Sequence, residues 1–331
     1  MLLKVFRGTG PGVIFLIIIS LAIFWISAFI NPKLPVSAIC EIKPMPLYGI
    51  IKLLIGNNSL LGVIFSFLIQ AIMLFLVISF NTSIFFINER TFLPAFIYLL
   101  FNSLFPQYLV LNPVLPATLF LMLAVMRIMD SYRKPGIAFN FFDAAILISI
   151  ASLFYANLIW FGLLVIIGIT LLRTVNIGEI ALSLLGLATP YILTIGLYYV
   201  LGKDLGIFLS DMKDNLFGET AGYPFQRLTI IVLIYSGLIV LISLGFLSTQ
   251  MNSKKIKSRK TFYLLFWWFL ISLALYFILP SISVEMIWII SIPASYFLAH
   301  YFIFVKKKLL PEIIFTGFFL LILLIQIFYI F

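Results

Sequence analysis

The chain has 331 residues, of which 64% are hydrophobic and only 10% are charged. The charged side chains are too few to cover the surface of a water-soluble globule of this size. The composition therefore excludes a soluble protein and predicts one that is surrounded by lipid. The formal net charge is +10. Because the basic residues fall in short segments between apolar runs, we attribute the charge to the positive-inside rule and expect no nucleic-acid partner.

The apolar runs predict an all-α, polytopic membrane protein with about eleven transmembrane helices, since about 20 apolar residues cross a hydrocarbon core of about 30 Å. The run 139–172 is too long for one crossing, and we divide it at Tyr155-Ala156-Asn157. The other expected spans are, in chain order, 12–30, 59–80, 91–105, a helix that ends near Arg127 to Lys134, 179–201, 228–248, 262–280, 285–304 and 311–331.

The basic residues predict the orientation of these spans. Lys4 and Arg7 precede the first span, and the densest basic cluster, Lys254 to Lys260, follows the eighth. If both segments are cytoplasmic, the N-terminus lies inside and the C-terminus outside, in a multi-pass protein of the bacterial inner membrane. Orientation and contact with anionic membrane lipids are enough to explain the cluster at 254–260, but it could also bind a membrane or cytoplasmic partner.

Three parts follow from this division of the chain. Residues 1–201 form a first transmembrane module, 202–227 an external amphipathic loop, and 228–331 the C-terminal transmembrane helices. The loop is rich in acids and contains Asp204, Asp211, Asp214 and Glu219. We find no repeat of fixed period and no soluble domain.

The inventory of reactive side chains excludes several kinds of site. The chain has one Cys (Cys40) and one His (His300), so a zinc site of the His/Cys type, paired-His haem ligation and a disulfide framework are ruled out. We therefore expect no metal and no cofactor. His300 is interpreted as an interfacial residue facing headgroups or a neighbouring helix, and Cys40 as a small packing residue.

Acidic residues beside a membrane are costly and are therefore candidates for function. Asp143, Glu179 and Glu285 each begin an expected helix, where an acid stabilises the positive end of the macrodipole, and we interpret them first as helix-end residues. Glu41 is different because it lies in the irregular loop between the first two spans and is the only acid there. It is our candidate catalytic residue.

The surrounding sequence resembles a known superfamily. Pro46-Leu47-Tyr48 opens a short amphipathic helix that contains Lys52, and Gly56-Asn57-Asn58-Ser59 precedes the second span. This arrangement resembles the first part of the GT-C superfamily of membrane glycosyltransferases. The string from Phe142 to Tyr155 is similar to a Leu-rich helix of the polyprenyl-phosphate-sugar-dependent mannosyltransferases, so the resemblance covers about residues 10–200. The whole chain also resembles an uncharacterised polytopic membrane family of Bacteroidota.

The resemblance implies a GT-C-like helical bundle that transfers a sugar, with inversion, from a polyprenyl-phosphate-linked donor to an envelope glycan or protein at the external face. Such a reaction needs a carboxylate base and cations for the leaving phosphate. Carried over to this chain, Glu41 would be the base and Lys43, Lys52 and Arg227 the phosphate ligands. Asp143 and Tyr48 are accessory candidates. The chain departs from the GT-C pattern after the first span, where Asn31-Pro32-Lys33-Leu34-Pro35 stands in place of an acid.

Two alternatives remain open on the sequence. A transporter or flippase for a lipid or amphipathic solute would need a polar cavity at the bilayer midplane, and Gln70, Asn81, Asn102 and Asn157 are its sparse candidates. The other alternative is a non-catalytic membrane scaffold of an envelope complex.

Overall fold

The computed structural model describes residues 2–33, 43–132, 138–173, 176–219, 226–306 and 309–330. Within these residues all regular elements are helices and none is a strand. Length and composition make seven of the helices suitable to cross a membrane, which confirms the prediction of an all-helical, multi-pass membrane protein. These seven are α2 (Pro11–Ile30), α4 (Ser59–Ile84), α9 (Ile177–Val200), α11 (Arg227–Gln250), α12 (Ile256–Ile278), α13 (Met286–Phe304) and α14 (Leu309–Ile330).

The other helices are shorter and connect or fill the bundle. They are α1 (Leu2–Phe6), α3 (Pro46–Ile55), α5 (Leu93–Asn102), α6 (Val114–Asp130), α7 (Ala138–Ser152), α8 (Gly162–Leu172) and α10 (Leu205–Phe217), with the 3-10 turns η1 (Pro106–Tyr108), η2 (Ala156–Phe161) and η3 (Met251–Ser253). The break between α7 and η2 falls at residues 153–155, which confirms that the long apolar run 139–172 does not form one helix.

Seven of the eleven expected spans are thus long helices, and the other four correspond to the shorter helices α5, α6, α7 and α8. The 10 residues of α5 extend for only about 15 Å, about half of a hydrocarbon core. All ten are buried, because α4 and α13 pack against them. A helix enclosed in this way can end at membrane depth, since the protein and not lipid surrounds its terminal backbone groups.

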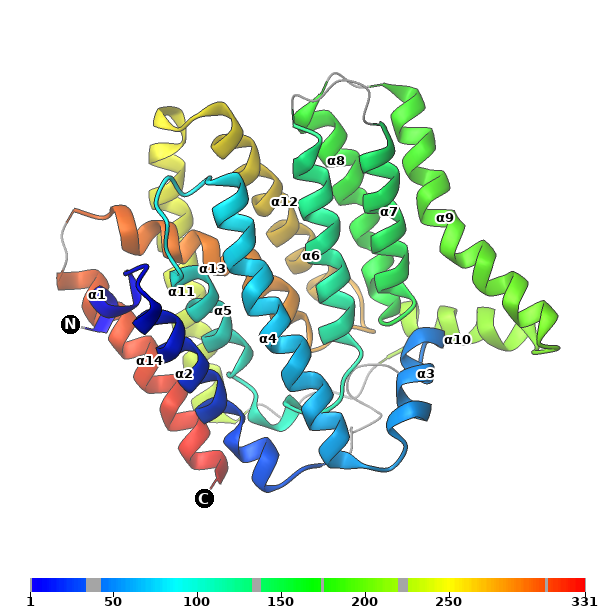
Figure 1. The fold of residues 1–331 in the computed structure, drawn as a ribbon, viewed down its shortest axis with the longest axis horizontal. Helices are drawn as coiled ribbons and strands as arrows, with labels where there is room; N and C mark the ends of the chain where they lie inside the picture. The colour runs from blue at the N-terminus through cyan, green and yellow to red at the C-terminus, as the bar shows by residue number, and fades with distance from the viewer. Residues whose placement is uncertain are drawn as a thin grey trace.

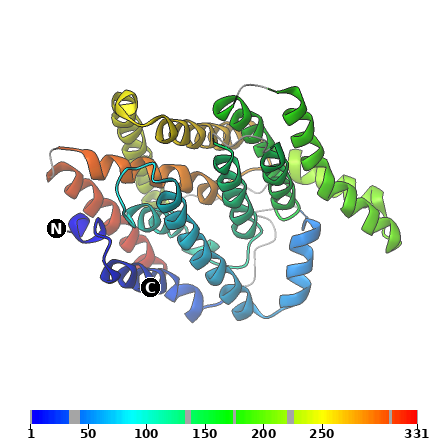
Figure 2. The same cartoon turned by 45° about the horizontal axis from the view of Figure 1, so that its top comes forward.

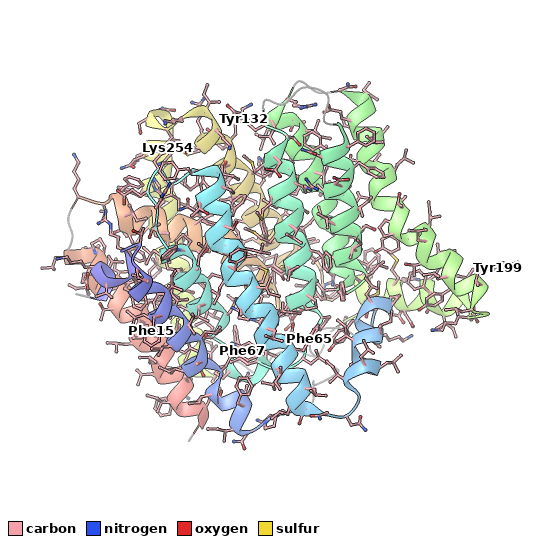
Figure 3. The ribbon with its side chains drawn as sticks, in the orientation of Figure 1. Phe15, Phe65, Phe67, Tyr132, Tyr199 and Lys254 are labelled. Carbon is pink, nitrogen blue, oxygen red and sulfur yellow. The ribbon has the colours of Figure 1, made fainter. Side chains whose placement is uncertain are left out.

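The long helices differ in how deeply the protein encloses them. Within the most apolar stretch of α13, 83% of the residues are buried, against 22% for α9. Helix α13 is thus the centre of the bundle, and α9 is an outer helix that packs along α7. Helices α9 and α10 project together from one side (Figures 1 and 2), with Tyr199 at the tip (Figure 3). The outward residues of α9, such as Leu185 and Ile192, are apolar and exposed, as a lipid-facing surface requires.

The two ends of the bundle carry different groups. The ends of α4, α6, α8 and α11 gather at the upper end in Figure 1, where Figure 3 also shows Lys254. Arg7 joins the N-terminal segment to this end: its Nη2 donates to the Ile303 carbonyl oxygen at 2.6 Å and lies 3.8 Å from Glu89 Oε2. The opposite end holds α3, the start of α4, and α10 (Figure 1). Lys254 thus lies at the same end of the structure as the ends of α4, α6, α8 and α11.

Gly186 allows α9 to approach α7 closely, which gives a prediction for stability. A Cβ atom at Gly186 would lie 2.7 Å from the Phe142 carbonyl oxygen and 3.0 Å from the Ala145 Cβ. Backbone cannot yield as a flexible side chain can, so Gly186→Ala is expected to destabilise the protein by about 1–3 kcal/mol, seen as a lower thermal midpoint in detergent. Gly196→Ala on the same helix is the control, because nothing lies within 4 Å of its Cβ position. Equal midpoints for the two variants would contradict the packing described.

Candidate functional site

Helix α3 is a short amphipathic helix on the surface of the bundle. Pro46 occupies its first turn, and Tyr48 is buried with its hydroxyl donating to the Leu111 carbonyl oxygen at 3.3 Å. On the other face Leu53 and Leu54 are 83% and 80% exposed. Two exposed leucines beside Lys52 are typical of a helix that lies in the membrane interface. The structure thus contains the short helix that the sequence predicts there.

A tight turn connects α3 to α4. Gly56 ends α3 with a φ of +60°, in the left-handed region that glycine adopts at little cost. The side chain of Asn58 then caps α4, since its Oδ1 accepts from the Leu61 N–H at 3.2 Å. The first turn of α4 carries further N–H groups and the positive end of the helix dipole, which favour an anion in this position.

A cavity of about 410 Å³ lies where the end of α2, helix α3 and the start of α4 meet. Among the residues that the structure describes, Lys33 and Lys52 are the cations of the lining, and no carboxylate lines it. Lys33 Nζ donates to the Tyr329 hydroxyl at 3.1 Å, and Lys52 Nζ lies 5.4 Å from the Tyr48 ring centroid. Neither ammonium group is paired with an acid of the described chain. The cavity is lined by Lys33, Lys52, Leu53, Ile55, Gly56, Asn57, Asn58, Ser59, Gly62 and Leu111.

This lining suits an anionic amphiphile. Two unpaired cations attract a phosphate, and the Asn57 and Asn58 side chains and the start of α4 add hydrogen-bonding groups. Leu53 continues from the cavity onto the exposed apolar face of α3. A divalent metal would instead require carboxylates, and the described chain has no group of three or more His, Cys, Asp or Glu side chains that could hold one.

Lys43 does not have the free ammonium group that the GT-C resemblance implies. Its Nζ lies 2.7 Å from Asp211 Oδ1 and 3.2 Å from Asp214 Oδ2 on α10. Hydrogen bonds to Asp211 and then Asp214 raise the pKa of the Lys43 ammonium. The ion pairs bring the segment after the first loop against the predicted external segment 202–227, so Lys43 joins these segments and is already neutralised by two carboxylates.

A buried polar network supports this junction. The side chain of Asn215 accepts from the Lys43 N–H at 3.0 Å and donates to the Lys43 carbonyl oxygen at 2.7 Å. Asn157 Nδ2 donates to the Asn215 carbonyl oxygen at 3.2 Å. Ser281 Oγ completes the network by donating to the Leu216 carbonyl oxygen at 2.8 Å. Residues from α10, from η2 and from the connection between α12 and α13 are thus held together beside Lys43.

Loss of the Asn215 amide is expected to loosen α10. Asn215→Ala removes both hydrogen bonds to Lys43 and leaves buried backbone groups without partners, which costs about 2 kcal/mol. Hydrogen exchange of residues 205–217 should accelerate, together with a lower thermal midpoint. Ser210→Ala on the exposed face of α10 is the control. If exchange of α10 is the same in both variants, the network does not hold the helix.

Glu285 is more than the helix-end residue that the sequence suggests. It precedes α13, but its side chain makes no capping hydrogen bond to that helix. Its Oε1 accepts from the Tyr155 hydroxyl at 3.0 Å and from the Ser283 N–H at 2.9 Å, whereas the buried Oε2 has no partner. The side chain is 1% exposed, and burial raises its pKa to about 7, against the opposing effect of these hydrogen bonds. Glu285 thus occupies the helix end that the sequence predicts, but its side chain binds Tyr155 and Ser283 and does not cap α13.

The other acidic and basic candidates lie apart from the cavity. Asp143 Oδ2 is 3.8 Å from Arg127 Nη2, near the start of α7, whereas η2 follows the other end of that helix. Arg227 is exposed at the first residue of α11 and does not line the cavity. Glu179 forms a partly buried ion pair with Arg173 at 2.6 Å. Glu41, the predicted base, lies outside the described residues.

The polar groups considered for transport serve the packing of the bundle. Asn102 Nδ2 donates to Gln70 Oε1 at 3.1 Å, and Ser291 Oγ donates to Asn102 Oδ1 at 3.1 Å. Asn81 Nδ2 donates to the Glu89 carbonyl oxygen at 3.2 Å. These groups are buried and bonded to other parts of the protein, so they do not favour a transport pathway.

His300 is buried in an aromatic environment and does not face lipid headgroups. It has no exposed surface, and its ring centroid lies 4.8 Å from that of Phe304, 5.3 Å from Phe262 and 6.0 Å from Phe246. The interfacial interpretation is wrong, and contact with neighbouring helices is the observed role.

Lys33 is the functional candidate that the sequence reasoning missed. It was set aside as part of the string that departs from the GT-C pattern, yet the structure places it in the same cavity as Lys52. The sequence feature that could have indicated it is a basic residue shortly after the first span, followed by a second basic residue in the amphipathic helix 46–55.

Fold and cavity together define a multi-pass helical membrane protein with a cationic cavity at one end. The model of a family of unknown function, DUF6427, matches residues 42–331. The chain belongs to this family, because the match includes most of its length. No curated protein and no solved structure matches the chain.

Proposed function

We propose that the protein binds a polyprenyl-phosphate-linked sugar through the Lys33–Lys52 cavity and transfers the sugar to an envelope glycan or protein at the outer face of the bacterial inner membrane. The observation that carries the proposal is the pair of lysines in a cavity of about 410 Å³, neither of which forms an ion pair with a carboxylate of the described residues. The GT-C resemblance supplies the reaction.

The phosphate and the polyprenyl tail of the donor would contact different parts of the site. The phosphate would contact Lys33 and Lys52, and each charge-assisted hydrogen bond contributes about 1.5–3 kcal/mol. The polyprenyl tail would leave the cavity along Leu53 and Leu54, whose exposed faces offer apolar contact at the membrane surface. This division explains why the cation Lys52 and two exposed leucines occur on one short helix.

In the proposed transfer, an acceptor hydroxyl oxygen attacks the anomeric carbon, and the bond from that carbon to the phosphate oxygen breaks. The bonding electron pair goes to the phosphate, where Lys33 and Lys52 stabilise the added charge. A carboxylate takes the hydroxyl proton. We assign that role to Glu41, by resemblance. Asp211 and Asp214 are carboxylates of α10, but Lys43 already binds them.

The proposal includes an orientation for the bundle. The cavity end would be external and the cation-rich end cytoplasmic, with the N-terminus inside and the C-terminus outside, and the four shorter helices would complete eleven traverses. Two contacts support this arrangement. Lys33 contacts Tyr329, near the C-terminus, at the cavity end, while Arg7 contacts Ile303 near the opposite end. The proposal thus assigns the two termini to different sides of the membrane, as an odd number of traverses requires.

The test compares envelope glycans and glycoproteins of cells that lack the gene, complemented by wild type, by Glu41→Gln or by Lys33→Gln/Lys52→Gln at equal membrane levels. A sugar that wild type restores and both variants fail to restore would support transfer. Lys203→Gln/Lys213→Gln is the control, since these lysines belong to the predicted external segment 202–227 and do not line the cavity. An unchanged glycan profile in the deletion would contradict glycosyl transfer, and full rescue by Glu41→Gln would remove that residue from the chemistry.

A further inference from the structure

A second set of cations lies at the end of the bundle opposite the Lys33–Lys52 cavity. Lys254 is partly buried there, between α11 and α12 (Figure 3). Its Nζ lies 4.8 Å from the ring centroid of Phe304 and 5.5 Å from that of Phe262. No carboxylate of the described chain forms an ion pair with it. Burial removes water from the Lys254 ammonium group, and the contacts with the two rings offset only part of this cost in free energy.

The environment of Lys254 disfavours its charged form. Burial lowers the pKa of the Lys254 ammonium to about 8, and no acidic neighbour counteracts that effect. A bound anion would supply the missing countercharge.

A cavity of about 330 Å³ lies beside Lys254. Phe304 lines this cavity and is also one of the two rings that Lys254 contacts. Lys306 and Gln250 provide its polar lining, and the remaining lining residues are Phe246, Phe304, Val305, Leu310 and Pro311. A neighbouring cavity of about 240 Å³ shares Val305 and Pro311 and is lined also by Lys4, Arg7 and Glu312. Among the described residues, the first cavity is thus lined by a cation and no carboxylate, whereas the second is lined by groups of both signs.

The first turn of α14 makes the rim of this junction apolar. Leu309, Leu310 and Ile313 are 72%, 55% and 62% exposed. A ligand in the cavity beside these residues would contact lysine ammonium groups on one side and an apolar surface on the other. A phospholipid has both parts, whereas a free phosphate ion would use only the cations.

We propose that the cavity lined by Lys306 and Phe304, with Lys254 beside it, binds the phosphate headgroup of an anionic phospholipid whose acyl chains lie along the start of α14. The lipid neutralises Lys254 and connects α11, α13 and α14. This inference is independent of the proposed glycosyl transfer, because it concerns the opposite end of the bundle and other residues.

The test measures the thermal midpoint of the purified full-length protein in neutral detergent with added dioleoylphosphatidylglycerol or with dioleoylphosphatidylcholine at equal mole fraction. Wild type is expected to be stabilised more by the phosphatidylglycerol. Lys254→Gln/Lys306→Gln should lose at least half of that difference. Lys306→Gln alone, a change at an exposed residue, should also reduce it, which keeps the test valid if the double variant folds poorly.

Lys255→Gln/Lys257→Gln is the matched control, because it removes the same number of positive charges from the segment that contains Lys254, at residues that do not line the cavity. Retention of the full difference in this control supports a specific site. Equal loss in the control, or equal stabilisation of wild type by both lipids, would overturn the proposal in favour of general surface charge. Stabilisation by inorganic phosphate equal to that by phosphatidylglycerol would overturn the lipid as the ligand.

Discussion

Replacement of Lys33 and Lys52 together by Gln is expected to weaken the binding of polyprenyl phosphate to the purified protein by at least about tenfold. The two lysines are the only cations that line the 410 Å³ cavity of the described chain. Loss of about 1.4 kcal/mol lowers an affinity tenfold, and one charge-assisted hydrogen bond to phosphate contributes about that much or more. The measurement is a binding titration in detergent with a short-chain polyprenyl phosphate.

Two controls separate the cavity from general surface charge. Lys203→Gln/Lys213→Gln should bind the ligand as wild type does, because neither residue lines the cavity. The affinity of wild type should fall as salt is added, and that of the cavity variant should fall less. Identical affinities for the cavity variant and wild type would remove Lys33 and Lys52 from phosphate recognition.

Protein stability should decrease as pH rises through the range set by Glu285. The pKa of this buried carboxyl is raised from an ordinary value of 4.5 to about 7, so the folded state prefers the protonated form. The contribution of Glu285 to the stability of the folded state is complete below about pH 4.5 and is lost as the pH rises to about 7. At about 1.4 kcal/mol for each pKa unit, the loss is on the order of 3 kcal/mol. Thermal midpoints between pH 5 and pH 8.5 would measure it.

Glu285→Gln should remove this pH dependence. The amide oxygen can still accept from Tyr155 and from the Ser283 N–H, and the neutral group resembles the protonated acid. The variant should match wild type near pH 5 and exceed it at pH 8.5. Asp143→Asn, a half-exposed carboxylate at the other end of α7, should leave the pH profile unchanged. A wild-type pH dependence that persists in Glu285→Gln would show that another group causes it.

Hydropathy predicted the helical, multi-pass architecture because a lipid solvent imposes long apolar runs on the sequence. The helices α2, α4, α9 and α11 to α14 begin and end close to the predicted residues. It could not predict that protein encloses α5 on all sides, because apolar composition does not distinguish a helix in contact with lipid from one enclosed by protein. The ten buried residues of α5 are as apolar as a lipid-facing segment.

The candidate site could be predicted only in part. The amphipathic pattern of residues 46–55 indicated an interfacial helix with Lys52, and the structure contains that helix. Contacts between segments that are far apart in the sequence determine which lysines line the cavity and which are paired with acids. Lys43 lies against Asp211, 168 positions along the chain, while Lys33 joins Lys52 across the end of α2. The burial of Glu285 and His300 likewise depends on neighbouring elements that local sequence does not specify.

Recognition of the phosphate by the Lys33–Lys52 cavity is tested by comparing how tightly polyprenyl phosphate and the corresponding polyprenol bind to wild-type protein in the same detergent. Both ligands carry the same tail, so any difference measures recognition of the phosphate. The lysine-lined cavity predicts that the phosphate binds at least about tenfold more tightly, and that this preference disappears in Lys33→Gln/Lys52→Gln. Equal affinity for the two ligands in wild type would contradict a phosphate site and, with it, the proposed donor.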